Sequence, residues 1–120
     1  MATLVTGTNL TTSGNSATQS INYGASVQVG DLIVAFGNSP NQNTSCTASD
    51  GANTFTVLFM GTAAGTTAVA AYSVATATRT TANTLTLTFG ASGFTAMEMY
   101  VFRPGSGEVF VLPTVAANFQ

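Results

Sequence analysis

The feature that most constrains the fold is a strict two-residue alternation in residues 84–89, which read Thr-Leu-Thr-Leu-Thr-Phe. Successive side chains of an extended strand point to opposite faces, so this order places Leu85, Leu87 and Phe89 on one face and three threonines on the other. The same order would not form a single apolar stripe on a helix. The pattern therefore predicts a β-strand with one face in a core and the other in solvent.

Similar short runs recur along the chain and are separated by Gly, Asn, Ser and Pro. Further strands are expected at residues 20–23, 27–29, 32–36, 54–60, 68–74, 94–102 and 109–112. The length of 120 residues suits one domain with one core. We therefore predict an all-β fold in which residues 1–120 form a single antiparallel β-sandwich of about eight strands, either jelly-roll or immunoglobulin-like.

Charge is scarce and limits the partners that the chain can bind. Only 5% of the residues are charged, against about a quarter in ordinary globular proteins. Two arginines and no lysine are too few to neutralise a row of phosphates, so nucleic acid and membrane surfaces are not expected partners. A net charge of −2 leaves little repulsion between copies. We expect a homo-oligomer.

The residue types needed for catalysis are mostly missing. The chain has no His, the commonest general base, and no Lys for a Schiff base. Two carboxylates can hydrolyse glycosides, and the candidate pairs are Asp31 with Asp50 and Glu98 with Glu108. Both aspartates, however, lie next to glycines in turn-like sequence. We predict no enzymatic activity, no catalytic residue and no cofactor.

Asp50 and Asn53 are candidate metal ligands, because their oxygens could bind Ca²⁺. An ordinary Asx turn explains the same residues, and no dense Asp/Asn loop surrounds them, so no metal site is predicted. Glu98 lies in an apolar strand, where a lone carboxylate is costly, so we expect it either to pair with Arg103 or Arg79 or to face outward. The lone Cys46 is expected to be a small buried hydrophobe.

Protein contact is the remaining kind of site. Both faces of residues 94–102 are largely apolar, so one should meet the core and the other a partner. Adaptable methionines suit a contact surface, and the terminal segments 1–12 and 108–120 are predicted to be arms that reach neighbours. The predicted interface residues are Met97, Met99, Val109, Phe110, Pro113 and Phe119. The three tyrosines Tyr23, Tyr72 and Tyr100 could form a platform that binds sugars. We prefer the alternative that they are ordinary buried or interface tyrosines.

Three motifs occur in a familiar order. Residues 29–34 read Val-Gly-Asp-Leu-Ile-Val, residues 50–56 read Asp-Gly-Ala-Asn-Thr-Phe-Thr, and the alternating segment 84–89 follows. Together they resemble the small β-sandwich modules of phage virion proteins and bacterial surface proteins, which carry "VGDLLVV", "D-x-x-G-N-T-W/Y-T" and "TVTVTF"-like segments. The resemblance covers residues 21–102. The second motif is shortened and has Phe55 where a larger aromatic residue is common, and the usual closing Glu-aromatic-x-Gly is not cleanly matched.

The resemblance implies a binding or assembly module without catalytic residues. We expect a virion structural protein, foremost a capsid decoration (cement) protein or a minor tail or fibre component, whose partners are its own copies and a major capsid or other virion protein. The alternatives are a carbohydrate-binding or adhesion module of a surface protein and a subunit of an extracellular filament. The N-terminus lacks the basic and apolar regions of a signal peptide, and we expect the protein in the virion, assembled in the host cytoplasm.

Overall fold

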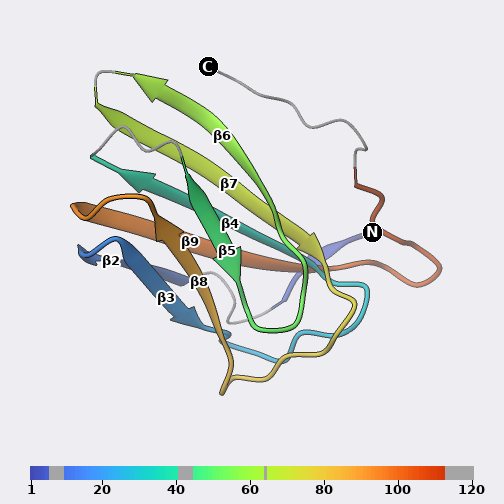
Figure 1. The fold of residues 1–120 in the computed structure, drawn as a ribbon. Helices are drawn as coiled ribbons and strands as arrows, with labels where there is room; N and C mark the ends of the chain where they lie inside the picture. Colours follow the sequence, from blue (N-terminus) through green and yellow to red (C-terminus); the bar gives the residue numbers. More distant parts are fainter. Residues whose placement is uncertain (6–9, 41–44, 64, 113–120) are drawn as a thin grey trace.

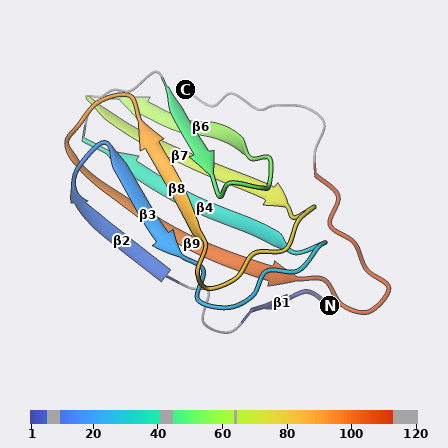
Figure 2. The ribbon, with the colours of Figure 1, turned by 60° about the horizontal axis from the view of Figure 1, so that its bottom comes forward.

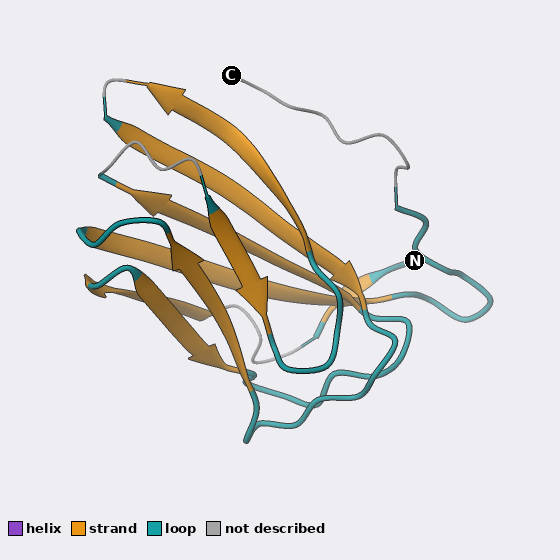
Figure 3. Cartoon of the chain, viewed as in Figure 1, coloured by secondary structure: helices purple, strands orange, loops and turns teal. Residues whose placement is uncertain are grey.

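The computed structural model describes residues 1–5, 10–40, 45–63 and 65–112, and within them every regular element is a strand (Figures 1 and 3). Two antiparallel sheets pack face to face, which confirms the predicted all-β sandwich. The strands are β1 (Thr3–Leu4), β2 (Leu10–Asn15), β3 (Thr18–Asn22), β4 (Leu32–Ser39), β5 (Cys46–Ser49), β6 (Thr56–Ala63), β7 (Thr66–Val74), β8 (Thr84–Phe89) and β9 (Phe94–Arg103).

The strand order decides between the two predicted sandwich types. The six-stranded sheet runs β1-β9-β4-β7-β6, with β2 also paired to β9, and the second sheet runs β3-β8-β5. The pairs are nested in the sequence, because β2 pairs with β9, β3 with β8, and β4 with β7. This wrapping of the chain back along itself is the jelly-roll arrangement rather than an immunoglobulin-like one.

The core lies between the two sheets and follows the predicted alternation in β8. Leu85, Leu87 and Phe89 are buried there, as residues 84–89 indicated. They face β4, where Gly37 allows a close approach of the two sheets. A Cβ atom added at Gly37 would lie 2.7 Å from Leu87 Cδ1 and 3.1 Å from the Phe89 ring. The absence of a side chain at Gly37 is therefore a packing requirement of this core.

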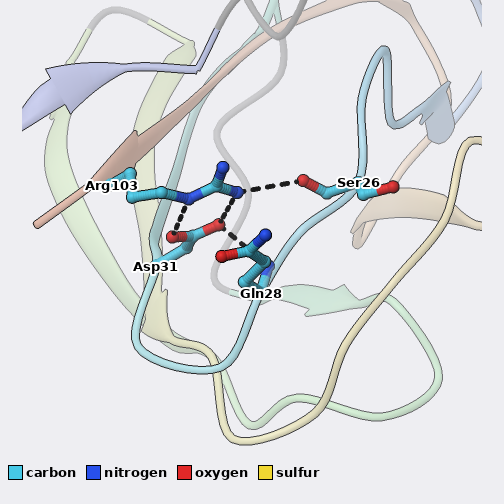
Figure 4. A network of polar contacts seen from close by, with 4 residues as sticks. All are labelled: Ser26, Gln28, Asp31 and Arg103. Carbon is cyan, nitrogen blue, oxygen red and sulfur yellow. Dashed lines mark hydrogen bonds and ion pairs between the residues drawn. The ribbon is translucent and has the colours of Figure 1, made fainter.

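An ion pair between the buried Asp31 and the partly exposed Arg103 joins the start of β4 to the end of β9 (Figure 4). Arg103 donates from Nε to Asp31 Oδ1 at 3.0 Å and from its terminal nitrogen to Oδ2 at 2.7 Å, and it also reaches the Ser26 carbonyl at 3.2 Å. The Gln28 amide donates to Asp31 Oδ2 at 2.9 Å. The bond to Asp31 raises the pKa of Arg103, and the pair fixes the end of the six-stranded sheet.

The described part of the N-terminal segment is not a free arm. Thr3 and Leu4 pair with the end of β9, and residues 10–12 pair with its middle, all within one chain. Within one chain these positions therefore belong to the sandwich, and the prediction that residues 1–12 contact neighbours stays a prediction. The pairing is possible because β9 is the longest strand and offers an edge long enough for both short strands.

Two strand predictions also differ from the structure, and some strands of the structure were missed. Residues 27–29 contribute a single bridge between Val27 and Arg79. Residues 109–112, predicted as a closing strand, belong to no strand. Conversely, β2 and β5 were not predicted, because they are rich in Thr, Ser and Gly and lack an apolar run.

Candidate protein-binding face

The candidate site is the face of the six-stranded sheet that points away from the second sheet, which we call the outer face. Figure 2 shows β3, β8 and β5 stacked against one side of β9, β4 and β7, and no strand of the described residues lies on the other side. Because side chains alternate, the even-numbered residues of β4, β7 and β9 point outward. The large apolar residues of the outer face are Leu32, Val34, Phe36, Leu58, Met60, Tyr72, Val74, Phe94, Tyr100 and Phe102.

The register brings these side chains together in rows across the strands. Val34 lies opposite Tyr100 on one side and Tyr72 on the other. Leu32, one row further along β4, lies opposite Phe102 and Val74. The outer face is therefore a continuous apolar surface.

Aromatic contacts order the centre of the outer face. The Tyr100 ring lies 6.4 Å from the Phe36 ring, edge to face, and 6.4 Å from the Phe102 ring, stacked at 18°. Such geometries stabilise ring pairs beyond simple burial. The rings thus keep fixed positions without a covering layer, as a preformed contact surface requires.

Glu98 is the one charged residue that the described strands place on the outer face. The Tyr100 hydroxyl donates to Glu98 Oε2 at 2.9 Å, and this bond raises the pKa of Tyr100. The outward-facing arrangement predicted for Glu98 is confirmed, and among the described residues Glu98 forms no ion pair with either arginine. Arg103 is five residues further along the same strand, so its side chain points to the opposite face and pairs with Asp31.

Part of the outer face is hollowed into a groove of about 720 Å³. Phe36 and Met60, 37% and 51% exposed, line it beside Glu98. Its lining also includes the small residue Ala68 and the polar residue Asn38. The groove thus combines apolar and polar groups, whereas the rest of the face is almost wholly apolar.

The predicted interface residues fall into three groups. Met97 and Met99 are 2% and 0% exposed and lie in the core, so the prediction that they form a contact surface is wrong. They pair with Gly37 and Ala35 on the inward side of β9, beneath the second sheet. Their even-numbered neighbours form the outer face instead.

The other predicted interface residues lie near the end of the chain. Val109 is 79% exposed, and Phe110 is half-buried. Both are therefore accessible to a partner. Pro113 and Phe119 lie outside the described residues.

Asp50 has a structural role in the turn, as the sequence indicated. Its Oδ1 accepts from the amides of Ala52 and Asn53, and its Oδ2 accepts from the Tyr23 hydroxyl at 2.8 Å and from Asn53 Nδ2 at 2.9 Å. Burial alone would raise the pKa of Asp50, but these hydrogen bonds together lower it. The stability that it contributes is present above its unfolded pKa of about 3.9 and is lost as the pH falls through the lower folded pKa.

Two further predictions concern Tyr23 and Cys46. Tyr23 is 1% exposed and cannot join Tyr72 and Tyr100 in a surface platform. Cys46 is buried, as expected of a small hydrophobe, and burial raises its pKa to about 11. At neutral pH it is therefore a protonated thiol with little nucleophilic character.

Within the described residues, no three His, Cys, Asp or Glu side chains gather as a metal site would require. The same part of the chain contains no helix long and apolar enough to cross a bilayer. Comparison of the chain with family models, curated proteins and solved structures gave no match. The functional proposal below therefore depends on the chain's own sequence and geometry.

Proposed function

We propose that this chain is a non-enzymatic structural protein that works by protein–protein contact, and that its outer face docks onto another protein of a virion. The observation that carries the proposal is the apolar surface centred on Val34, Tyr72 and Tyr100, on which no strand of the described residues packs. Antiparallel sheets ordinarily have one solvated, polar face, and large exposed apolar patches mark interaction sites. The resemblance in three motifs favours a capsid decoration protein, or a tail or fibre component.

The size of the outer face suits a partner protein. Four neighbouring strands of about eight residues cover roughly 500 Å², a large part of the roughly 800 Å² that each partner contributes to a standard interface. The scarcity of charge also fits, because charged residues are depleted at interface centres. Docking would bury aromatic side chains that already hold fixed positions.

Substitution at the centre of the outer face tests this proposal. Val34→Asp should weaken attachment at least about tenfold, because docking would bury an unpaired carboxylate. Thr86→Asp is the matched control, since it places the same charge at an outward position of the other sheet. The measurement is co-sedimentation with particles assembled from the structural proteins encoded beside this chain.

A milder variant separates a loss of attachment from a loss of folding. Val34→Thr keeps the shape of the side chain and should weaken attachment less than Val34→Asp, with an unchanged circular dichroism spectrum. Equal attachment of Val34→Asp and Thr86→Asp, with both folded, would contradict docking by the outer face. Absence of the wild-type chain from every particle would contradict the virion role itself.

The groove favours a second candidate, a carbohydrate-binding module. Phe36 offers a ring for stacking against a sugar, and Asn38 and Glu98 offer polar groups for its hydroxyls. A glycan array separates the two candidates: binding that is lost in Phe36→Ala, in a chain that attaches to no particle, would favour the adhesion module. A filament built by donation of residues 1–12 is less favoured, because β1 and β2 pair within their own chain.

A further inference from the structure

Residues 109–112, Val-Phe-Val-Leu, have the composition of a strand but belong to none. Val109 and Val111 are 79% and 85% exposed, whereas Phe110 and Leu112 are half-buried. β-branched and aromatic residues of this kind favour pleated strands. A segment that is apolar on both of its faces would be stable as a strand only where both faces meet apolar neighbours.

Among the described residues, one sheet edge without a paired neighbour meets that requirement. The outermost strands of the three-stranded sheet, β3 and β5, have polar outward residues, as Ser20 and Thr47 illustrate. In β6, by contrast, Val57 and Phe59 pack against the core while Leu58 points outward. Its pairing with β7 is regular from residue 56 to residue 59, before a bulge at Phe59/Gly61. This edge matches the four-residue segment in length and in apolar character.

The segment cannot lie along β6 of its own chain. Glu108 binds both the Met1 amino group and the Gly105 amide, which fixes the start of the segment beside β1. Strands β1 and β6 are opposite edges of one sheet, four strand spacings apart, or roughly 19 Å. Four extended residues span at most about 14 Å. The segment can therefore reach a free β6 edge only on another molecule.

We propose that residues 109–112 add as a strand to the β6 edge, residues 56–59, of a second copy of this chain. Main-chain hydrogen bonds would join the two copies, and alternate side chains would pack beside Val57 and Phe59 on one face and Leu58 on the other. The added strand would also widen the outer face. This inference rests on the proposed function in treating the chain as an assembly subunit, but it uses a different surface and a different partner.

The contact is head-to-tail, because a segment of one copy meets a different part of the next. Such contacts close into rings or continue as filaments. A closed ring of three copies would be the trimer that analogy with decoration proteins favours. The strand contact would link neighbouring copies, while the outer faces would remain free to dock on a particle.

The test compares two substitutions of exposed valines. Val111→Asp should weaken self-association at least about tenfold in sedimentation equilibrium, because it places a charge in the added strand. Val29→Asp, which changes a 65% exposed valine in a distant loop, should leave self-association unchanged. Equal self-association of the two variants would overturn the inference, as would a wild-type chain that stays monomeric at high micromolar concentration.

A mixing experiment tests the pairing of segment and edge. Leu58→Asp should impair the acceptor edge and Val111→Asp the donor segment, so each variant alone should be monomeric. An equimolar mixture should form heterodimers, because each partner retains the half that the other lacks. A mixture that stays monomeric would exclude this pairing. A circular dichroism spectrum like that of the wild type shows that each variant is folded.

Attachment to particles, measured on the same variants, separates this inference from the proposed function. Val111→Asp should still attach, whereas Val34→Asp should not. A wild-type monomer that attaches to particles would overturn the strand contact and leave the docking role intact. A chain that self-associates through residues 109–112 but attaches to no particle would overturn the docking role and leave the strand contact intact.

Discussion

The two sheets have similar inner faces and very different outer faces. In β8 the outward residues are threonines, and in β3 the Ser20 hydroxyl shares a 2.8 Å hydrogen bond with that of Thr86. In β4 and β9 the equivalent outward positions hold residues such as Val34 and Tyr100. Folding requires apolar residues only between the sheets, and the threonine face shows that this chain can make a polar exterior. The apolar outer face is therefore best explained by contact with a partner.

The same comparison shows how an apolar exterior can persist on a folded chain. Each outward side chain is partly shielded by its neighbours in the next strand, so Val34 and Tyr100 are only half-exposed. Shielding within one layer is incomplete, and a second layer would remove the remaining apolar surface from water at about 25 cal/mol per Å². The proposed docking would complete a burial that the described residues leave unfinished.

The largest expected effect is on the inner side of β8. Leu87→Ala should lower the free energy of unfolding by about 2–5 kcal/mol, through lost burial and a cavity. Thr86→Ala, on the polar outer side, should cost less than about 0.5 kcal/mol. Urea unfolding of both variants measures the difference. If Thr86→Ala cost more free energy of unfolding than Leu87→Ala, the threonines would face inward. The outer faces of the two sheets would then not differ as described.

A smaller effect is expected at Gly37, which lies on the inward side of β4. Gly37→Ala should lower the free energy of unfolding by about 1–3 kcal/mol, because the new methyl group meets Leu87. In Gly37→Ala/Leu87→Ala the methyl group has room, so the double variant should lose less than the sum of the two single losses. If the two losses of unfolding free energy simply added in urea unfolding, Gly37 would not face Leu87. Because neighbouring residues of β4 point to opposite faces, the outward placement of Phe36 would then be wrong too.

The smallest effect is expected from salt. Raising NaCl to about 1 M shortens the Debye length to about 3 Å, yet attachment to particles should change less than about twofold, because apolar burial carries it. Thermal unfolding measured at each salt concentration serves as the control for the fold. A steep loss of attachment at constant stability would show that charges such as Glu98 or Arg79 dominate the contact.

The contrast between β8 and β9 also shows how far the sequence could predict this structure. In β8 only one face is apolar, so alternation alone identified Leu87 as a core residue. In β9 both faces are apolar, and alternation separates them without showing which one is inward. That choice depends on the second sheet, which covers Met97 and Met99 and leaves Tyr100 outside. The existence of an apolar exterior was thus predictable, but its residues were not.

Other features depend on long-range pairing that local patterns do not encode. Asp31 and Arg103 are far apart in the chain, and only the pairing of β4 with β9 brings them together. Residues 109–112 have strand propensity, but propensity needs a neighbouring edge before it produces a strand. The prediction of a strand there was wrong for the single chain and becomes the proposed contact between copies.

The nested pairing of strands has a consequence for how this protein is made. Strand β2 leaves the ribosome well before its partner β9, because the strands β3 to β8 lie between them in the chain. Contacts so distant in sequence incur the entropy of closing a long loop before they gain stability, which makes folding of such topologies slow, on the order of milliseconds to seconds. During that interval β4 lacks β9 and exposes apolar residues on both of its faces. The nascent chain therefore passes through a period of high aggregation risk that ends only when β9 is inserted.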